Sequence, residues 1–499
     1  MKQTSNYLAF DLGAESGRAV LGRFDGEKLT LETLHRFPNG PVKLFQSLYW
    51  DVLRLFNEIK AGLAIYKREY GKEQLAGVGL DTWGVDFGLL NKNDELLSNP
   101  HNYRDPRTEG MVQEAFARVP REEIFQYTGI QFMEINTLYQ LLSMKLQNDP
   151  ILEQAETLLM MPDLFNFWLT GVKACELSEA TTSQLYDPRQ KDWAYPLIEK
   201  LGLPKHIFQK IIPPGTILGP LHSTIAQEVG LEGVSVIAPA CHDTGSAVAA
   251  VPAQSENFAY ISSGTWSLMG IESPEPIITE ESLAFNFTNE GGVFGTIRFL
   301  KNIMGLWLVQ ECRRTWAQEG EELSYAELTE LAAQAPAFGP LIEPDSTEFL
   351  RPGNMPERIR QFCARTGQAQ PESKGEIVRC ALESLALKYR WVLEKLELML
   401  GKEIGTIHVV GGGSQNWLLC QLTADATQRP VIAGPVEATS TGNILMQAIA
   451  HGEVGSLAEA REIVRRSFEL ITYEPHGGDG WEEAYRRFLK IKEQLPEVQ

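Results

Sequence analysis

The 499-residue chain has few cysteines, and none of them form a motif. No two make a C-x-x-C pair, which argues against a zinc cluster or a thioredoxin-type motif. Scattered thiols of this kind are typical of a reducing compartment. The spacing of Cys363 and Cys380 permits a disulfide, but reduced thiols are the expected state there. The six cysteines are Cys175, Cys241, Cys312, Cys363, Cys380 and Cys420.

Long hydrophobic runs are also missing. No apolar stretch reaches the length of a transmembrane helix. The first residues, "MKQTSNYLAFDLG", lack the apolar core of a signal peptide. We therefore expect a cytoplasmic protein with no membrane partner.

Positive charge is in deficit, since 45 Lys and Arg residues face 65 Asp and Glu residues and leave a formal net charge of −20. Such a chain repels phosphate at long range, which disfavours nucleic acids and anionic membranes as partners. A small anionic ligand remains compatible, because local loops and a metal ion can bind it. The sequence gives no indication of an oligomeric state.

The length predicts two domains, or three, and the 43% apolar content is that of a globular protein. The order of expected strands and helices indicates an α/β fold. Residues 6–37 show three short strands with turns at 13–17 and 25–26. A helical pattern follows over 50–71, and then a strand, a loop and a strand over 75–90.

The second half repeats this order. A strand, turn and strand over 257–277 are followed by helical segments and then by a strand, glycine loop, helix and strand over 404–434. We interpret this as a diverged duplication with its boundary near residue 250, giving domains 1–250 and 251–499. The expected helices are 301–318, 324–334, 374–400 and a charged, solvated one at 480–494.

Three loops are candidates for binding phosphate: "DLGAESGR" (11–18), "SSGTWS" (262–267) and "HVVGGGSQN" (408–416). Glycines let backbone N–H groups converge on an anion without crowding by a Cβ. Taken singly, the first two are better interpreted as ordinary hairpin turns. The third lies between a strand and a helix expected to begin near Gln415, where helix-start N–H groups favour anions. No Walker A motif is present, and the third loop is not a dinucleotide fingerprint.

Asp243 stands in "VIAPACHDTGSAVAA", between an expected strand and an expected helix. One interpretation is a helix N-cap, which is a common position for Asp. The other is a general base, because ligands of open α/β sheets bind where strands end. A kinase that acts on a hydroxyl uses a carboxylate to accept its proton. Both roles are compatible at one position.

Taken together, the motifs resemble the FGGY carbohydrate kinases over nearly the whole chain. The resemblance rests on stretches that follow one another from residue 11 to residue 443: "DLGAESGR", "GLDTWGVDFGLL", "YRDPRT", "MPDLFNFWLTG", "CHDTGSAV", "YISSGTWSLMG", "LKNIMGLWLVQ", "HVVGGGSQN" and "AGPVEATSTGN". It implies two actin-like, ribonuclease-H-like domains with an ATP and sugar cleft between them. It also implies a Mg²⁺-dependent transfer of the ATP γ-phosphoryl group to the 1-hydroxyl of L-rhamnulose, with sugar and ATP as the partners.

The resemblance also implies roles for single residues. Asp243 is expected to be the catalytic base, and Asp11 to help hold Mg²⁺ directly or through water. Glu15 adds a carboxylate to the first phosphate loop, so it is expected to face away or to reach a metal-bound water. The expected sugar contacts are Gly84, His242, Asp243, Thr244 and Asn302. The expected ATP contacts are Ala14, Glu15, Ser16, Gly17, Arg18, Thr265, Gln310 and Gly412.

Structural roles compete with several of these assignments. His242 is equally a satisfied structural histidine, Asn302 a helix cap and Gln310 an exposed side chain. For Asp81 and Asp86 we favour turn and cap hydrogen bonds, and for Trp83 a place in the core. Arg104, Asp105 and Arg107 of "YRDPRT" are equally compatible with a surface ion-pair network and with an indirect role at the active site, beside which the resemblance places this loop.

Three other functions remain open at the level of sequence. One is a sibling kinase for fuculose, xylulose or glycerol, with the same chemistry and a different pocket. Another is an ATP-binding sensor that transfers no phosphate, although such a protein has no need of Asp243. A hydrolase is less favoured, because no nucleophile constellation is evident.

Overall fold

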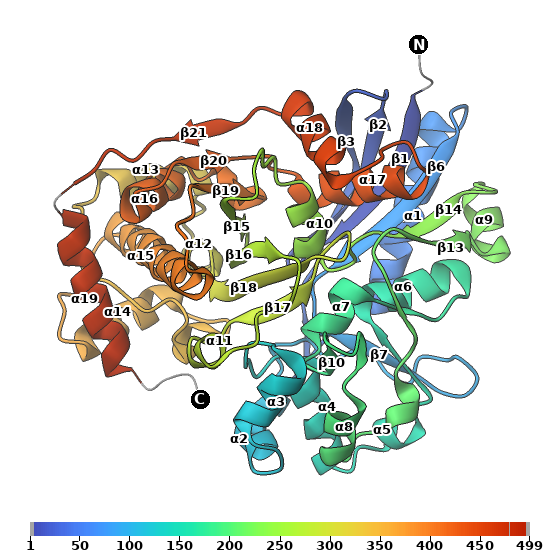
Figure 1. Ribbon diagram of the computed structural model, residues 1–499, viewed down its shortest axis with the longest axis horizontal. Coiled ribbons are helices and arrows are strands. Elements are labelled where there is room, and N and C mark those ends of the chain that lie inside the picture. Colours follow the sequence, from blue (N-terminus) through green and yellow to red (C-terminus); the bar gives the residue numbers. More distant parts are fainter. Residues whose placement is uncertain (1–3, 479, 496–499) are drawn as a thin grey trace. The chain divides into compact units, whose positions relative to one another are not determined.

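The computed structural model describes residues 4–478 and 480–495 and is mixed α/β (Figure 1). The chain divides into two compact units. The first comprises 1–252, 272–299 and 438–468, and the second comprises 253–271, 300–437 and 469–499. Across the described residues, no helix combines the length and apolar character that a bilayer crossing needs.

The first unit contains a six-stranded sheet in the order β13-β14-β6-β1-β2-β3. The hairpin strands predicted at the N-terminus are confirmed: β1–β2 and β2–β3 are antiparallel. β6 is parallel to both β1 and β14. The carboxyl ends of β1, β6 and β14 therefore lie along one edge of the sheet. The bounds are β1 (Ser5–Leu12), β2 (Ser16–Phe24), β3 (Leu29–Pro38), β6 (Leu75–Thr82), β13 (Thr216–Pro220) and β14 (Ser235–Ala238).

Helix α1 (Val52–Tyr70) follows the predicted pattern. Asp51 caps its N-terminus by accepting a hydrogen bond from the backbone N–H of Arg54, and Gly71 ends it. One face is buried at the i, i+3 and i+4 spacing that an amphipathic helix requires. Its buried side chains are Val52, Leu55, Ile59, Leu63 and Tyr66.

The second sheet has seven strands in the order β17-β18-β16-β15-β19-β20-β21. β15 is antiparallel to β16 and parallel to β19, which is parallel to β20. In the first sheet, the strands β2, β1, β6 and β14 are neighbours in the same order and with the same relative directions. The predicted duplication is therefore confirmed in topology. The bounds are β15 (Phe258–Ser263), β16 (Trp266–Ser273), β17 (Thr288–Gly291), β18 (Ile297–Met304), β19 (Thr406–Val410), β20 (Val431–Ala433) and β21 (Ile471–Tyr473).

Two expected helices need correction. The segment expected over 301–318 begins as strand β18, and helix α12 (Trp307–Gln318) starts only after Gly305. Pairing of "IRFLKNIM" within the sheet overrides its helical appearance. The last helix, α19 (Gly480–Gln494), is not simply solvated, because Trp481, Tyr485 and Phe488 are buried. Tyr485 also donates a hydrogen bond to Glu394 on helix α15 (Lys374–Leu400).

The other expected helices are confirmed, and the cysteines are buried and free. Helix α15 (Lys374–Leu400) begins with a capping box formed by Ser373 and Glu376 and ends at Gly401. The remaining helices include α2 (Met111–Phe116), α3 (Arg121–Thr128), α4 (Thr137–Leu146), α6 (Met161–Thr170), α7 (Leu177–Thr182), α8 (Tyr195–Lys200), α9 (Ser223–Val229), α10 (Asp243–Ala249), α13 (Tyr325–Gln334), α14 (Met355–Arg365), α16 (Trp417–Thr427), α17 (Ala438–Ala450) and α18 (Leu457–Ser467).

Candidate active site

The first candidate loop is the turn between β1 and β2. Asp11, near the end of β1, pairs in register with Arg18 on β2, and Arg18 Nε lies 3.2 Å from Asp11 Oδ2. The backbone N–H of Gly13 donates to the carbonyl of Ser16, and Asn39 braces the turn through the carbonyls of Gly13 and Glu15. The residues expected to contact ATP, 14–18, therefore form a tight turn that carries a cation beside a buried carboxylate.

A second carboxylate lies next to Asp11. Asp81 occupies the position opposite Asp11 on the parallel strand β6 and is fully buried. Burial, followed by the charge of Asp11, raises the pKa of Asp81 well above the usual range, and the amide of Asn443 opposes this. Asn443 donates to Asp81 Oδ2 over 2.6 Å, so a hydrogen bond within a turn or cap is not what holds Asp81.

Helix α17 supplies side chains to this edge that the sequence reasoning missed. Ser440 Oγ lies 3.3 Å from Asp11 Oδ2, and Asn443 holds Asp81. A Cβ on Gly442 would stand 1.8 Å from the backbone oxygen of Ser246, so only glycine lets α17 approach α10 this closely. The stretch "ATSTGN" contained these residues, but nothing local showed which strands they would meet.

Asp243 lies at the same edge of the sheet, after β14. It is the first residue of α10, and its side chain is 32% exposed. The helix N-cap is His242, so the capping role considered for Asp243 is wrong. Burial raises the pKa of Asp243, and Asp11 acts in the same direction, while His242 and the hydroxyl of Thr244 lower it. The pKa of this carboxylate is therefore raised above the usual value of an aspartate.

The turn that carries Asp243 is held from α7. Glu176 accepts a hydrogen bond from the backbone N–H of Cys241 over 2.9 Å, and Ser178 Oγ accepts one from the backbone N–H of His242 over 2.9 Å. Thr82, at the end of β6, donates its N–H to the carbonyl of Cys241. Three fixed anchors thus set the direction in which residues 242 and 243 project. The stretch "CELSEA" (residues 175–180) contains Glu176 and Ser178, but its sequence gave no indication that these residues anchor the turn.

The imidazole of His242 faces a buried ion pair. Its Nδ1 lies 3.1 Å from Arg298 Nη2 and 3.3 Å from Glu290 Oε2. Its Nε2 lies 3.6 Å from Asp243 Oδ1. Arg298 is completely buried, and its Nη2 lies 3.1 Å from Glu290 Oε2. His242 is therefore held between a structural ion pair and the candidate base.

The loop after β6 carries the expected sugar contact Gly84. A Cβ at this position would stand 2.9 Å from the side chain of Thr182 on α7. The next residue, Val85, has a φ of 69°, which is strained for a β-branched side chain. The hydroxyl of Thr182 accepts a hydrogen bond from the backbone N–H of Val85, and the hydroxyl of Thr137 donates one to its carbonyl. Strain that the surroundings maintain in this way is found preferentially at functional sites.

Asp86 does not form the turn and cap bonds favoured for it. It is fully buried and accepts hydrogen bonds from the indoles of Trp50 and Trp83 over 2.6 and 2.9 Å. Burial raises the pKa of Asp86 to about 6. Trp83 is buried as predicted, with its ring centroid 4.0 Å from that of Trp50. The carboxylate therefore fixes the packing beneath the sugar loop.

The "YRDPRT" stretch does not form a surface ion-pair network. Arg104 and Asp105 are buried. Asp105 caps a short 3₁₀ helix, η1 (Pro106–Thr108), and accepts the N–H of Leu48. Arg107 donates to Gln140 on α4. These bonds make the stretch a packed loop.

In the second unit, the other two glycine-containing loops lie side by side. They follow the parallel neighbours β15 and β19, and a Cβ on Gly413 would stand 2.0 Å from Ser263 Oγ. Gly412, which starts the short helix η4 (Gly412–Gln415), is exposed and has nothing within 4 Å of a Cβ. The carbonyl of Thr265 accepts the N–H groups of Gly305 and Trp307, at the start of α12. These contacts bring together the ends of β15 and β19, the two glycine-containing loops and the start of α12.

Neither Gln310 nor Asn302 takes the structural role considered for it, which was an exposed side chain for Gln310 and a helix cap for Asn302. Gln310 is half-buried on α12, and its buried Oε1 has no hydrogen-bond partner among the residues that the structure describes. Asn302 lies in β18 and caps no helix, because the N-cap of α12 is Leu306. α16 begins at Trp417, slightly later than expected, with Asn416 as its N-cap.

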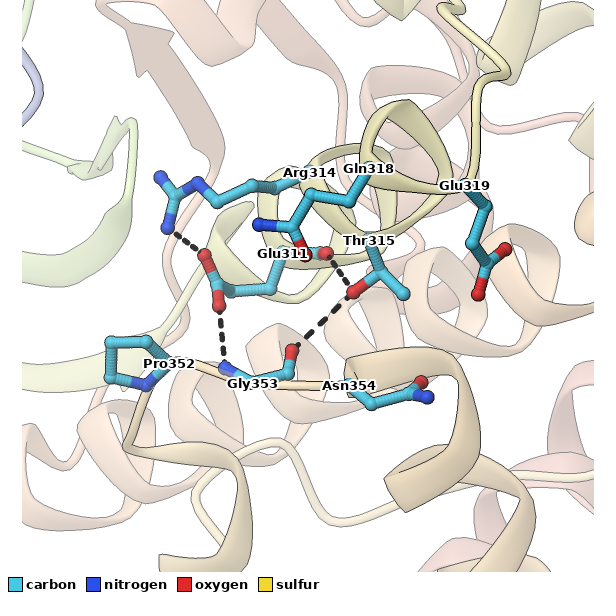
Figure 2. A pocket seen from close by; sticks show the side chains of 8 residues that line it. All are labelled: Glu311, Arg314, Thr315, Gln318, Glu319, Pro352, Gly353 and Asn354. Carbon is cyan, nitrogen blue, oxygen red and sulfur yellow. Dashed lines mark hydrogen bonds and ion pairs between the residues drawn. The ribbon is translucent and has the colours of Figure 1, made fainter.

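A cavity of about 460 Å³ lies further along α12, against residues 352–354 (Figure 2). Glu311 lines this cavity and forms an ion pair with Arg314. It also accepts a hydrogen bond from the backbone N–H of Gly353 over 2.9 Å. Glu311 and Glu319 make the lining unfavourable for phosphate. Its lining residues are Glu311, Arg314, Thr315, Gln318, Glu319, Pro352, Gly353 and Asn354.

Comparisons with known proteins agree with this architecture. A xylulose kinase from Lactobacillus acidophilus has a similar fold, with a TM-score of 0.79 at 16% identity, covering 98% of this chain and 97% of that one. A glycerol kinase from Plasmodium falciparum, solved with ADP, gives 0.78 at 14% identity and covers all of both chains. These likenesses show the fold, which is the actin-like ATPase fold of the FGGY carbohydrate kinase structures.

The sequence comparisons define the family. The N-terminal domain of the FGGY family of carbohydrate kinases matches residues 6–250, and the C-terminal domain matches residues 259–451. The chain belongs to this family. It is 46% identical over 488 residues to a rhamnulokinase from Bacteroides thetaiotaomicron, covering 98% of this chain and 99% of the relative. A rhamnulokinase from Oceanobacillus iheyensis is 44% identical, covering 93% and 97%.

Proposed function

We propose that this kinase is a rhamnulokinase, which transfers the γ-phosphoryl group of ATP to the 1-hydroxyl of L-rhamnulose and releases ADP and L-rhamnulose 1-phosphate. The observation that carries the proposal is the anchored "CHDT" turn, which presents the partly exposed carboxylate of Asp243 at the end of the sheet. The two rhamnulokinases named above match this chain over nearly all of their length. We also infer that the enzyme acts in L-rhamnose catabolism, in the cytoplasm.

Asp243 would be the general base. As the 1-hydroxyl oxygen bonds to the γ-phosphorus, its proton passes to the Asp243 carboxylate and the bond from phosphorus to the ADP oxygen breaks. A raised pKa suits this step, because a base works best when its pKa approaches the working pH. His242, Thr244, Gly84 and Asn302 would contact the sugar.

Two groups of residues would bind ATP. Ala14, Glu15, Ser16, Gly17 and Arg18 form the first loop, where Arg18 supplies a cation. Thr265 and Gly412 lie in the glycine-containing loops of the second unit. Gln310 Oε1 is buried and accepts no hydrogen bond within the described part of the chain, and an N–H donor of the nucleotide would satisfy it. We infer the division at residue 250 for function, with the sugar residues Gly84, His242, Asp243 and Thr244 and the first phosphate loop in 1–250. The nucleotide residues Thr265, Gln310 and Gly412 lie in 251–499.

Asp11 would hold Mg²⁺, directly or through water. Proteins commonly bind magnesium with one or two carboxylates, and substrate phosphates and water complete the shell. Asp11 offers one such carboxylate beside the first loop, and among the described residues no group of three or more acidic, histidine or cysteine side chains forms a dedicated metal cage. Bound with ATP, the ion would neutralise charge on the transferring phosphoryl group.

The test is ADP release from Mg²⁺-ATP with L-rhamnulose, L-fuculose, D-xylulose and glycerol in separate reactions, with mass detection of the product. We expect strong turnover with L-rhamnulose and a product phosphorylated at the 1-position. Turnover only with another acceptor would contradict the sugar assignment and keep the base. Binding of ATP without turnover on any acceptor would favour a sensor.

A further inference from the structure

The ion pair of Glu290 and Arg298, which contacts His242, takes no direct part in the proposed phosphoryl transfer. Arg298, on β18, is completely buried, and Glu290, on β17, is 3% exposed. Removing two charges from water is costly, and replacing such a pair by apolar side chains is often neutral or stabilising. A buried pair that touches the histidine beside the candidate base therefore invites a functional explanation.

The position of the guanidinium is defined by several contacts. Arg298 Nε donates to the carbonyl of Gly291 over 2.9 Å, and Nη2 reaches both Glu290 Oε2 and His242 Nδ1 at 3.1 Å. Arg298 also acts on Glu176, whose pKa burial raises and Arg298 lowers. The cation is thus fixed among the groups that hold the "CHDT" turn.

Two contacts at Nδ1 bear on where His242 carries its proton. The contact with Arg298 Nη2 at 3.1 Å has the geometry of a hydrogen bond, whereas Glu290 Oε2, 3.3 Å away, lies within ion-pair distance only. A guanidinium has only donors and does not lose its proton in proteins, so the atom facing Nη2 must be an acceptor. Nδ1 of a neutral imidazole is an acceptor only when the proton is on Nε2. With a proton on Nδ1, two donors would face each other at 3.1 Å. The hydrogen bond made by one ring nitrogen determines whether the other ring nitrogen carries the proton.

We propose that the buried Glu290–Arg298 pair holds His242 in the tautomer protonated at Nε2. The Nε2–H group then faces the sugar side, 3.6 Å from Asp243 Oδ1. There it donates to a sugar oxygen and favours the ionised carboxylate. Glu290 balances the charge of Arg298, so that the cation does not act as an unpaired charge. Arg298 is thus a positioning residue for the sugar and the base.

The first measurement is ¹⁵N NMR of the substrate-free full chain labelled at histidine. The chain has eight histidines, and the signals of His242 are those lost in His242→Gln. We expect an unprotonated Nδ1 and a protonated Nε2 in the wild type. In Arg298→Met, the Nδ1-protonated or doubly protonated form should become populated. A wild-type His242 that carries a proton on Nδ1 would overturn the proposal.

The second measurement is kinetic and rests on the proposed function. We expect Arg298→Met to lower kcat/KM for L-rhamnulose by about 10–100-fold, the usual effect of removing an outer hydrogen-bond partner, without changing KM for ATP. Arg298→Lys, which keeps a donor and the charge, should recover part of the loss. The matched control is Arg429→Met, which removes an ion pair to Glu397 in the second unit and should change neither value.

Folding and function can be separated. If Arg298→Met does not fold because Glu290 is left as a buried unpaired charge, Arg298→Met/Glu290→Gln removes both charges and carries the test. An unchanged tautomer together with a loss no larger than that of Arg429→Met would refute the proposal. The NMR result needs no turnover, so a wild type inactive on every sugar would remove the proposed function and leave the tautomer to be decided by the spectra.

Discussion

At the scale of single residues, the site depends on carboxylates whose surroundings differ. Asp11, Asp81 and Asp243 lie at the same edge of one sheet, yet each has its own partners. Asp11 faces Arg18, Asp81 is buried against Asn443, and Asp243 keeps a partly exposed side chain. Environment, rather than residue type, thus distinguishes the proposed metal ligand Asp11, the buried Asp81 and the proposed base Asp243.

Asp243→Asn should lower kcat by about 10²–10⁴-fold, which is the usual contribution of a general base. The fold should persist, because the Asn side-chain oxygen can still accept from Thr244 and His242 remains the N-cap. The measurement is kcat with L-rhamnulose, with circular dichroism melting as the control for folding. Wild-type turnover in this variant would show that another group accepts the proton.

The pH dependence of the wild type offers a second check on Asp243. Only its ionised form accepts a proton, so kcat/KM should fall as the pH drops through its pKa. Because burial raises that pKa, the fall should begin at a higher pH than for an ordinary aspartate. A profile that stays flat down to the usual aspartate range would contradict the assignment.

Asp86 makes stability depend on pH. Its folded pKa is about 6, whereas an unfolded aspartate titrates near ~3.9. The folded state binds this proton more tightly, so the contribution of Asp86 to stability is largest below about pH 4 and declines towards about pH 6, by roughly 3 kcal/mol. Urea unfolding across this range should show the decline in the wild type relative to Asp86→Asn. Parallel profiles would argue against it.

At the scale of elements, the site is built from strand ends and the turns that follow them. The glycine loops of the second unit are ordered by close contact: Gly413 has no room for a Cβ, and Gly412 has ample room. Neighbouring glycines of one motif therefore have different functions. The first allows the loop to pack on Ser263, and the second leaves the backbone open to a ligand.

Gly413→Ala should destabilise the protein by roughly 1–3 kcal/mol, as overpacking commonly does. Gly412→Ala should leave the melting temperature unchanged and raise KM for ATP, because the added methyl group meets solvent or nucleotide only. Thermal melting and initial rates at varied ATP separate the two effects. Equal destabilisation by both substitutions would contradict this distinction.

Several elements were predictable because their signals are local. Helix α1 has a cap, an apolar stripe and a terminal glycine, and the hairpin β1–β2 has its turn glycines. The start of α12 was not predictable, because residues 301–304 lie in a strand between β17 and β16, and the helical appearance of the local sequence does not reveal this pairing. Asp243 similarly had a local cap signal, but His242 takes that position.

At the scale of the whole molecule, net charge opposes the binding of ATP. The chain carries −20 charges, and the resulting field repels a nucleotide at long range. Raising the ionic strength from 0.01 to 0.15 M shortens the Debye length from about 30 to about 8 Å. We expect kcat/KM for ATP to rise with salt at constant free Mg²⁺, and kcat/KM for the neutral sugar to change little. A fall with salt would show that local cations near the loops dominate.

The sequence by itself determined the α/β class, the duplicated order of strands and loops, and the stretches that carry the site, because these depend on periodicity, turn residues and short motifs. Only the tertiary structure decided which distant side chains meet. Asp11 and Asp81 share an edge through parallel pairing, and Arg298 reaches His242 across 56 residues of sequence. Strand register and helix docking set these contacts, and both are long-range properties that no local pattern encodes.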